Sequence, residues 1–408
     1  MAGPLTGIRV LDLSRVMAGP WCTQILADLG AEIIKVERPE TGDETREWGP
    51  PWLASREDHS NDLSAYYIAA NRGKHSLAID IKQTEGQEIV RRLAADSDIL
   101  VENFMAGTLA RYGLGYDDLK RINPGIVYCS ITGFGQDGPR AGEAGYDYLI
   151  QGLGGLMSLT GIEDGQSGAG PIRSGLPIAD LATGLYATIA ILAALRHRDI
   201  SGAGQHIDMA LLDAQIGILG NQAQNYFVSG NCPTRTGRIH PNLAPYQPFP
   251  ASDGEIVIAV GNDRQFQRLC AALEAPGLAS DPRFAANPDR VKNRAALADA
   301  IAAITPLHTR GEWIARLKSV NVPCGPINDL RDVFVDPQVR HRGMRQELEH
   351  PLLGTLAILA NPMRFSETGI EYHKAPPLLG EDTDRILADR LGYTAAEIER
   401  LRKQAVIQ

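Results

Sequence analysis

The chain has 408 residues, a formal net charge of −9 and a hydrophobic content of 44%. This length predicts about two or three domains, and the composition is typical of an ordered globular chain. The acidic balance excludes a generally basic nucleic-acid binder, although a local basic pocket for an anionic ligand is compatible with it. We expect no membrane partner either, because the most apolar stretch, Leu185 to Leu195, is shorter than the roughly 20 residues of a spanning helix.

The N-terminal residues have neither a basic segment nor a long apolar core, so no signal peptide is expected. The five cysteines are scattered and form no CxxC or Cys/His cluster, and none of the nine histidines belongs to a recognisable metal motif. Neither a disulfide framework nor a metal site is therefore predicted. A cytoplasmic location follows, or a mitochondrial matrix after loss of a transit peptide.

The first half of the chain alternates strand and helix signals. Helical spacing begins near Pro20 and again at Thr84. Short apolar runs predict strands at Ile8–Leu13, Glu32–Val36, Ser76–Ile81, Asp98–Val101 and Ile126–Ile131. This βαβ series predicts an α/β fold with a parallel sheet and helices on its faces.

The second half begins with a Gly-rich region that ends at Asp180. Helices are predicted over Leu181–Arg198 and Ala210–Phe227, with a strand over Gln205–Met209 between them. The sequence becomes irregular from Ser229, where a second domain is expected to begin. Further elements are predicted at Glu255–Val260 (strand), Asp263–Leu273, Val291–Ala303, Thr309–Val320, Asp382–Leu391 and Ala395–Lys403 (helices).

Basic residues cluster around the predicted strands. Arg15 follows the first strand, Arg38 the second, Lys74 lies near the third, and Arg111 comes beyond the fourth. Ligands of parallel sheets bind outside the carboxyl ends of the strands, so this set suits a phosphorylated ligand. Solvated surface cations are an equal alternative. The G-x-G-x-x-G and P-loop patterns are absent, which excludes nucleotide binding in the manner of a Rossmann dehydrogenase or a P-loop enzyme.

Asp180 stands between a Gly-flanked apolar segment and a predicted helix. Aspartate is a favoured helix N-cap residue, which is the ordinary structural explanation. A helix N-terminus also stabilises a carboxylate anion, and such an anion is what acyl transfer through an anhydride requires. The residues alone leave both interpretations open.

Several segments together resemble the class III CoA-transferases, the family of formyl-CoA transferase and L-carnitine CoA-transferase. In chain order they are GIRVLDLSRVMAGPWCTQILADLGAEIIKVERPETGDETR, NRGKHSLAIDIK, VENFMAGTLARYGLGYDDL, ITGFGQDGPRAGEAGYD, SGLPIADLATGLYATIAILAAL, VPCGPINDL and APPLLGEDTD. The resemblance covers essentially the full chain. ADLATGLYA and PYQPF add a closer likeness to dicarboxylate-type members such as succinyl-CoA:glutarate (hydroxymethylglutarate) CoA-transferase.

The resemblance implies an acyl-CoA:carboxylate CoA-transferase that moves CoA from succinyl-CoA to a C4–C6 dicarboxylic acid. In this mechanism Asp180 forms first a mixed anhydride and then an aspartyl-CoA thioester. Coenzyme A and acyl-CoA enter as substrates, and no permanent cofactor or metal is implied. By correspondence with the family, the CoA-binding residues are Arg15, Val16, Ala18, Gly19, Arg38, Arg72, Lys74, Asn103, Phe104 and Arg111.

Two alternatives remain within the family, a 2-methylacyl-CoA racemase and a catalytically silent CoA-binding member. Tyr146 occupies the position where the racemases carry an imidazole base, which favours a transferase and makes Tyr146 a candidate substrate residue. The distal carboxylate of a dicarboxylate also needs a cationic partner. Candidates are Arg46, Arg173, Arg238 and His240, and the loop from Arg238 to His240 is favoured because it replaces the glycine loop of formyl-CoA transferases.

The resemblance finally implies the domain organisation. We expect a Rossmann-like large CoA-binding domain over residues 1–228, completed by 375–408, and a smaller α+β domain over 229–330. Residues 331–374 are expected to form a return linker. Two ring-shaped subunits would interlock as a homodimer.

Overall fold

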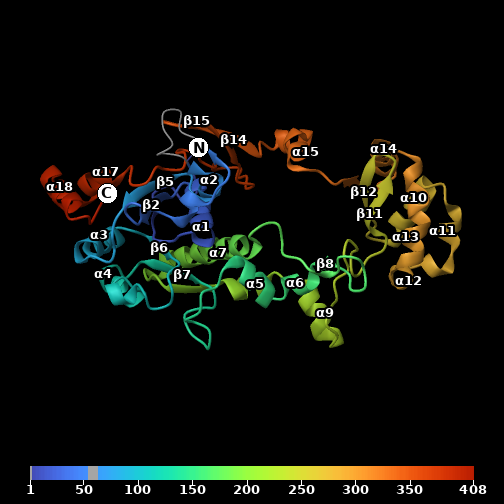
Figure 1. Cartoon of the computed structure of the whole chain (residues 1–408), viewed down its shortest axis with the longest axis horizontal. Coiled ribbons are helices and arrows are strands. Elements are labelled where there is room, and N and C mark those ends of the chain that lie inside the picture. The colour runs from blue at the N-terminus through green and yellow to red at the C-terminus, as the bar shows by residue number, and fades with distance from the viewer. Residues whose placement is uncertain (1, 54–62) are drawn as a thin grey trace. The chain divides into compact units, whose positions relative to one another are not determined.

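The computed structural model describes residues 2–53 and 63–408, which form two compact units. The large unit contains residues 2–53, 63–156, 174–228 and 340–408, and the small unit contains residues 157–173 and 229–339. Both ends of the described chain belong to the large unit (Figure 1). The expected boundary near Ser229 coincides with a change of unit, whereas the small unit also includes residues 157–173 and extends to 339.

A six-stranded parallel sheet forms the centre of the large unit, with the strand order β10-β7-β6-β1-β2-β5. Its strands are β1 (Arg9–Asp12), β2 (Glu32–Glu37), β5 (Lys74–Ala78), β6 (Ile99–Glu102), β7 (Val127–Thr132) and β10 (His206–Ala210). The prediction of an α/β fold with a parallel sheet is confirmed. The strand order reverses direction at β1, and such a switch point is where open α/β sheets bind ligands.

Both faces of the sheet are buried against helices. Successive residues of a strand point to opposite faces, so neighbouring residues belong to different cores. Val10 packs in one core cluster with α1 (Ala18–Asp28) and α7 (Ile178–Ser201), and Leu11 packs in the other with α3 (Thr84–Ala95), α17 (Thr383–Leu391) and α18 (Ala395–Lys403). Burying each such side chain stabilises the fold by about 1.5–3 kcal/mol. Because both faces are buried, successive residues of strands such as β1 (Val10 and Leu11) are apolar.

Helix α7 has 24 residues and is long and apolar enough, by length and composition, to cross a membrane. Half of its most apolar window is buried within the protein, where α7 packs against α1. The buried residues include Ala187, Ile191 and Leu195, which belong to the core cluster of the sheet. Its composition is therefore that of a core helix.

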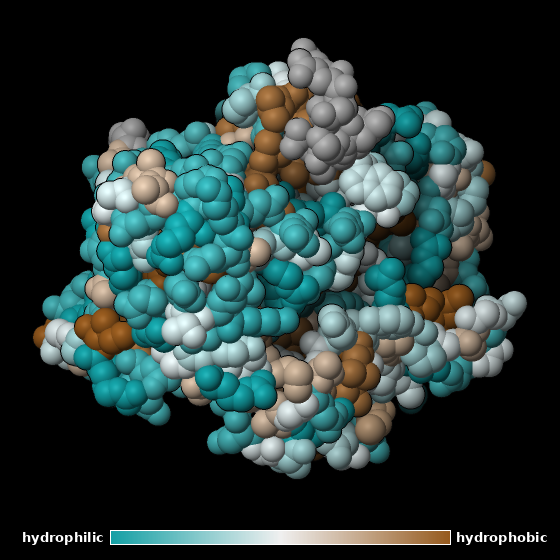
Figure 2. All heavy atoms as spheres, turned by 60° about the vertical axis from the view of Figure 1, so that its left-hand side comes forward, coloured by the Kyte–Doolittle hydropathy of each residue, from teal (hydrophilic) through white to brown (hydrophobic). Residues whose placement is uncertain are grey.

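The C-terminal helices cover the other face and tie the end of the chain to β5. Ile398 and Leu401 of α18 are buried, while the face of the molecule in Figure 2, which brings the α17–α18 side forward, is mostly hydrophilic. Beyond α18, the Gln408 amide donates to the Ala78 carbonyl (3.2 Å), and Ile407 forms a bridge with Ile79. The last residues of the chain thus pair with the end of β5.

Two regions differ from the expected elements in more than their boundaries. The predicted helix over 210–227 is broken into α8 (Leu211–Gly217) and α9 (Asn221–Ser229), because Gly220 between them adopts a left-handed conformation with φ 54°. The expected return linker instead contains a hairpin of β14 (Arg345–His350) and β15 (Gly354–Leu359) in the large unit. Alternate residues of this hairpin are buried, a strand pattern that the Pro-rich flanks concealed.

Shorter elements complete the large unit. They are η1 (Glu44–Glu47), β3 (Trp52–Leu53), β4 (Leu63–Ser64), α2 (Ala65–Ala70), η3 (Ala110–Tyr112), α4 (Tyr116–Ile122), α5 (Asp147–Leu153) and the start of α6 (Leu156–Leu159). The chain passes from the small to the large unit after α15 (Leu330–Val335), in α16 (Pro337–His341).

The small unit is built on an antiparallel sheet of β11 (Tyr246–Ala251), β12 (Gly254–Ala259) and β13 (Cys324–Pro326). Its core includes the fully buried Trp313. The other elements are the pair β8 (Gly161–Ile162) and β9 (Gly170–Pro171), and the helices α10 (Asp263–Ala272), α11 (Pro276–Ser280), η4 (Pro282–Phe284), α12 (Asn287–Lys292), α13 (Arg294–Ala302), η5 (Thr305–Leu307) and α14 (Arg310–Ser319).

Candidate active site

Asp180 lies in the first turn of α7, and its exposed fraction is 8%. It does not cap the helix, because the N-cap position is Pro177, which offers no side-chain hydrogen bond. The capping carboxylate comes from Asp147, whose Oδ2 accepts the amide protons of Ala179 (2.8 Å) and Asp180 (3.2 Å). The N-cap interpretation of Asp180 is therefore wrong, and its carboxyl group is available for chemistry.

Asp147 is itself held in place by a neighbour on the same helix, α5. Gln151 is fully buried, and its amide nitrogen donates to Asp147 Oδ1 (2.6 Å) while its oxygen accepts from the Ser174 amide (2.9 Å). The two helices are thus locked together at the residue that could act as a nucleophile. Sequence reasoning missed this role, since the capping residue lies 33 positions before the amide that it caps.

The environment of Asp180 favours its neutral form. Burial raises its pKa to about 7, and the negative charge of Asp147 adds to this shift. Among the described residues, no cation offsets the shift. Close to neutral pH the group therefore exchanges between a carboxylic acid and a carboxylate, the form that can attack a carbonyl carbon.

Tyr66 of α2 is the second group near Asp180. Burial, followed by the charges of Asp180 and Asp147, raises the pKa of its phenol to about 12. Its ring makes an edge-on contact with Trp48, with 5.1 Å between the ring centroids. A phenol that stays protonated can donate a hydrogen bond to an oxygen that gains negative charge. The sequence analysis did not identify this residue.

A cavity of about 260 Å³ opens at the carboxyl ends of β1, β2, β5 and β6. Its cations are Arg15, Arg38 and Lys82, and Arg38 and Lys82 are exposed. It is further lined by Leu13, Val36, Glu37, Gly42, Asp43, Ile79, Asp80, Ile81, Phe104, Thr108 and Tyr112. Apolar walls with several cations at one rim suit a nucleotide or another phosphorylated ligand.

Lys74 is not at this cavity, which corrects the expected phosphate contact. It is fully buried, and its ammonium donates to Asp12 Oδ2 (3.1 Å), Pro20 O (3.0 Å) and Asn71 Oδ1 (3.0 Å). Burial lowers its pKa to about 8 despite the Asp12 charge. All three ammonium protons are used within the protein, so none remains for a ligand.

The position of β5 accounts for the two lysines. The strand spans Lys74–Ala78 rather than the expected Ser76–Ile81, so Lys74 begins the strand and Lys82 lies beyond its carboxyl end. Because Lys82 also directly follows the expected strand, the strand-end rule points to Lys82 with either boundary. The sequence analysis did not apply the rule to this strand and therefore missed Lys82.

Arg72 also lies away from this cavity. It forms a buried bidentate ion pair with Asp28 (2.8 and 2.6 Å), and its guanidinium stacks over the Tyr372 ring at 5.5 Å. Arg111 is exposed on η3 and donates to Thr108 (3.2 Å), a residue that lines the cavity. Of these two expected contacts, the structure therefore places only Arg111 beside the cavity.

The loop after β1 is held by Asn103. Its side chain accepts from the Arg15 amide (2.9 Å) and donates to the Arg15 carbonyl (2.7 Å), and the Arg15 guanidinium lies 5.2 Å from the Phe104 ring. Gly19 is required by packing, because a Cβ there would lie 2.3 Å from Ser14 Cβ. Gly19 and the neighbouring Ala18 are both buried in the first turn of α1.

The candidates for the distal carboxylate occupy different surroundings. Arg46 is not available, because Glu37 binds its guanidinium in a bidentate pair (2.8 and 2.7 Å). Arg238, in an ion pair with Glu255, belongs to the small unit, as do Arg173 and His240. The His240 ring nitrogen accepts from two backbone amides of its own loop (3.1 and 3.2 Å).

Tyr146 is the N-cap residue of α5 and is 67% exposed. It directly precedes Asp147, which contacts the backbone of Asp180. Of the expected substrate residues, Tyr146 is therefore the one whose position in the large unit is tied to Asp180. In residues 2–53 and 63–408, no group of three or more His, Cys, Asp or Glu side chains could hold a metal ion.

The fold and the site together define an α/β protein with a cation-rimmed cavity beside β1 and a buried aspartate of raised pKa at a helix N-terminus. The chain belongs to CoA-transferase family III, whose model matches residues 5–383. The resemblance noted in the sequence is thereby confirmed.

Individual relatives agree with this assignment. The chain is 47% identical over 386 residues to a succinate–glutarate CoA-transferase of Agrobacterium fabrum, covering 95% of each chain. It is 43% identical to a succinyl-CoA:glutarate CoA-transferase of Mus musculus, covering 99% of this chain and 90% of the relative. The structure resembles a CAIB/BAIF family protein of Brucella suis with a TM-score of 0.84 and 47% identity, covering 96% of this chain and 100% of that one.

Proposed function

We propose that this protein transfers CoA from succinyl-CoA to a C4–C6 dicarboxylic acid. The observation that carries the chemistry is Asp180, a carboxyl group with a pKa of about 7, buried at a helix N-terminus and facing no offsetting cation among the described residues. The choice of acids rests on the two relatives described above, both of which are named for succinate or succinyl-CoA and glutarate.

The proposed reaction proceeds through two covalent forms of Asp180. The carboxylate attacks the donor thioester, which releases CoA thiolate and leaves a mixed anhydride. The thiolate attacks the aspartyl carbonyl carbon, which releases the donor acid and leaves an aspartyl-CoA thioester. The acceptor carboxylate then attacks this thioester, and the released thiolate takes the acceptor acyl group from the second anhydride. Each step exchanges one acyl bond for another, so no redox partner is needed.

Two features of the site fit these steps. Tyr66 keeps its phenolic proton and can donate to the oxygen of a tetrahedral intermediate. Arg38 and Lys82 are exposed at the rim of the 260 Å³ cavity and can hold the phosphates of CoA by charge-assisted hydrogen bonds. Arg111 lies beside the same cavity, and the loop from Arg15 to Gly19 would adjoin the pantetheine arm.

We further propose that the protein acts as a cytoplasmic homodimer, with CoA and carboxylic acids as its ligands and no permanently bound cofactor. Apolar side chains on α7 and α9 support the dimer: Ile189 is 62% exposed, Phe227 72% and Val228 79%. A second copy of the chain would remove such surface from water. Light scattering should give twice the chain mass of 44.1 kDa.

The specificity is tested with acid pairs of equal chain length. With succinyl-CoA as donor, glutarate should accept CoA much faster than valerate, because a distal carboxylate is recognised as well as the reacting one. Equal use of valerate would contradict the dicarboxylate assignment. Oxalate is tested as a further acceptor acid. A 2-methylacyl-CoA is tested for racemisation, which should not occur.

The covalent route is tested separately. Intact-mass analysis after mixing with succinyl-CoA should show an adduct that hydroxylamine removes, as expected for an anhydride or a thioester. A protein that binds CoA but never forms this adduct would be a silent member of the family.

A further inference from the structure

The turn from Ser14 to Val16 adopts a backbone conformation that its sequence disfavours. Val16 has a φ of 71°, in the left-handed region, where a β-branched residue is a genuine outlier. Such conformations persist only where the surrounding structure imposes them, and they gather at functional sites. This turn follows β1, and Arg15 at its centre lines the 260 Å³ cavity.

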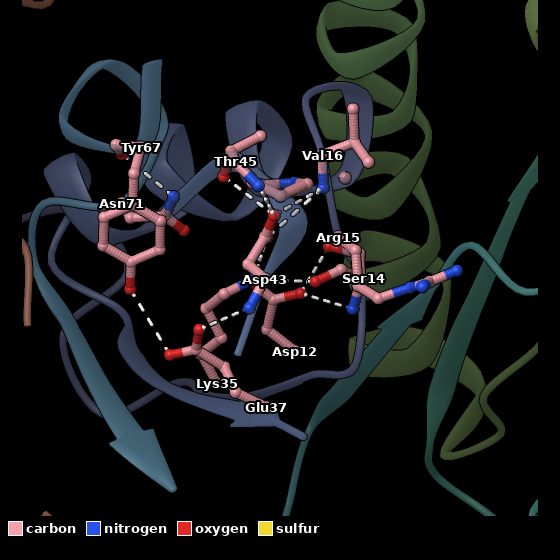
Figure 3. Close-up of polar contacts among 12 residues, drawn as sticks. Asp12, Ser14, Arg15, Val16, Lys35, Glu37, Asp43, Thr45, Tyr67 and Asn71 are labelled. Carbon is pink, nitrogen blue, oxygen red and sulfur yellow. Dashed lines mark hydrogen bonds and ion pairs between the residues drawn. The ribbon is translucent and has the colours of Figure 1, made fainter. Parts of the chain in front are cut away.

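Buried side chains hold the backbone of this turn (Figure 3). The Ser14 amide donates to Asp12 Oδ1 (2.9 Å), and the Ser14 carbonyl accepts from the Lys35 ammonium (2.7 Å). The Val16 amide donates to both carboxylate oxygens of Asp43, at 3.2 Å each. Because Asn103 binds both polar groups of Arg15, the turn is fixed at three successive residues.

Asp43 is the partner that faces the left-handed residue itself. It is 1% exposed, it lines the cavity, and it forms an ion pair with the fully buried Lys35 (3.0 Å). Burial alone would raise its pKa, but Lys35 and the amide and hydroxyl of Thr45 lower it below the usual value. The carboxylate is therefore anionic at neutral pH and accepts from Val16 and Thr45 at the same time (Figure 3).

A buried ion pair is weak evidence for a stabilising role, because desolvation of both charges can exceed their attraction. An apolar pair of similar volume would often give an equally stable fold. The pair of Lys35 and Asp43 has instead a specific geometric effect, since both residues bind the backbone of the turn. Its position suggests a role in shaping the cavity wall.

We propose that Asp43, charged by its pairing with Lys35, is a positioning residue that keeps Val16 left-handed and so preforms the wall of the CoA cavity. This inference rests on the proposed function, because the ligand of the cavity is taken to be acyl-CoA. A preformed wall strengthens binding, since the ligand does not have to order the turn when it binds. Asp43 itself takes no part in acyl transfer.

The first test compares Asp43→Asn with the rescue variant Asp43→Asn/Val16→Gly. Asparagine has one acceptor oxygen in place of two and leaves Lys35 without its ion-pair partner Asp43. The KM for succinyl-CoA should therefore rise about tenfold, while kcat should stay within about threefold of the wild-type value. Glycine adopts a positive φ without steric strain. The rescue variant should therefore have a KM at least about threefold below that of Asp43→Asn.

Asp382→Asn is the matched control. Asp382 is also a buried carboxylate with cationic partners, Lys374 and Arg385, but it does not line the cavity. Its loss should lower thermal stability and leave KM for succinyl-CoA unchanged. A general effect of losing a buried charge pair would instead raise KM in both variants.

A second pair of variants covers the case in which Asp43→Asn fails to fold. Lys35→Met/Asp43→Leu removes both charges of the pair at similar volume, so it should be more stable than Asp43→Asn even though Asp12 loses one of its two lysines, and KM should rise. Adding Val16→Gly should again lower KM. A stable variant with unchanged KM, or a raised KM that glycine does not restore, would overturn the positioning role.

Direct titration with CoA separates this inference from the proposed function. The wild type should bind CoA, and Asp43→Asn should bind about tenfold more weakly. If the wild type does not bind CoA, the proposed function fails. If both bind CoA equally, the function stands and the positioning role of Asp43 is wrong.

Discussion

The pKa values of two buried carboxyl groups in the large unit are shifted in opposite directions. Asp12 is fully buried, and burial alone would raise its pKa, but Lys74, Lys35 and hydroxyl hydrogen bonds lower it to about 2. Asp180 is nearly as buried, yet its pKa rises to about 7, because Asp147 is the charge that acts on it and no cation does among the described residues. Burial is common to both sites, so the presence of cations decides the direction of the shift.

Asp12 and Asp180 illustrate two different roles of a buried carboxyl group, one structural and one chemical. At Asp12 the carboxylate accepts from Lys74, Ser14 and Thr23, and the result is a group that stays charged and holds its neighbours in place. At Asp180 the cation is missing and a like charge caps the helix, and the result is a group that can change protonation near neutral pH. A reactive carboxyl group thus requires that its neighbours leave its charge uncompensated.

The largest expected effect is at Asp180. Asp180→Ala removes the proposed nucleophile and should lower the rate of CoA transfer by at least about 1,000-fold while the fold is retained. Steady-state kinetics and circular dichroism measure the two properties. The control is Asp199→Ala, an exposed aspartate near the other end of α7, which should keep wild-type activity. Near-normal turnover in Asp180→Ala would eliminate the covalent mechanism.

The second expected effect concerns Asp12 and its ion-pair partner Lys74. Lys74→Met leaves the buried Asp12 without one of its two lysines, so the free energy of unfolding should fall by about 3–5 kcal/mol. Urea denaturation measures this change. Lys82→Met at the cavity rim should instead raise KM for acyl-CoA with little change in stability. A stable Lys74→Met variant with a raised KM would restore the phosphate contact expected from the sequence.

The third expected effect is the pH dependence of stability at Asp180. The pKa of about 7 in the folded chain lies above the ordinary aspartate pKa of 3.8, so between these values the unfolded chain has lost a proton that the folded chain keeps. Stability from this group therefore falls as the pH rises through this window. Asp180→Asn lacks the penalty and should be more stable than the wild type at pH 8 by on the order of 2–4 kcal/mol, but equal to it near pH 4. A difference that is independent of pH would refute the raised pKa.

The smallest of the four effects is at the cavity rim. Arg38→Ala should raise KM for acyl-CoA by about 10- to 100-fold, as expected for loss of hydrogen bonds to a charged group, without lowering the melting temperature. Arg121→Ala on α4 is the control, because Arg121 is exposed and does not line the cavity. An unchanged KM in Arg38→Ala would place the phosphates elsewhere.

Local signals predicted much of the fold. Helix α18 agrees with the sequence prediction at both ends and α3 begins at the predicted Thr84, because a helix of this kind is set by apolar spacing along one segment. The break between α8 and α9 and the start of β5 were not predicted. These boundaries depend on packing and on backbone conformation at single residues, which periodicity does not report.

The candidate site was only partly predictable for the same reason. Asp180 was found by resemblance, whereas the cap by Asp147 joins residues that are distant in the sequence. Lys74 and Lys82 have the same chemistry, but Lys82 lines the cavity, whereas Lys74 is buried and its ammonium is bound within the protein. The pairing of Arg46 with Glu37 likewise cannot be read from either residue alone.

The pairing of the last residues with β5 has a consequence for the synthesis of the protein. The Asp80 amide donates to the Val406 carbonyl (2.8 Å), and Ile79 pairs with Ile407, so the segment from Ile79 to Lys82 is held by residues made long after it. While the chain is being translated, this wall of the 260 Å³ cavity has no partner. A nascent chain in which β1, β2, β5, β6 and β7 are already made would therefore still lack the residues that hold this wall of the cavity.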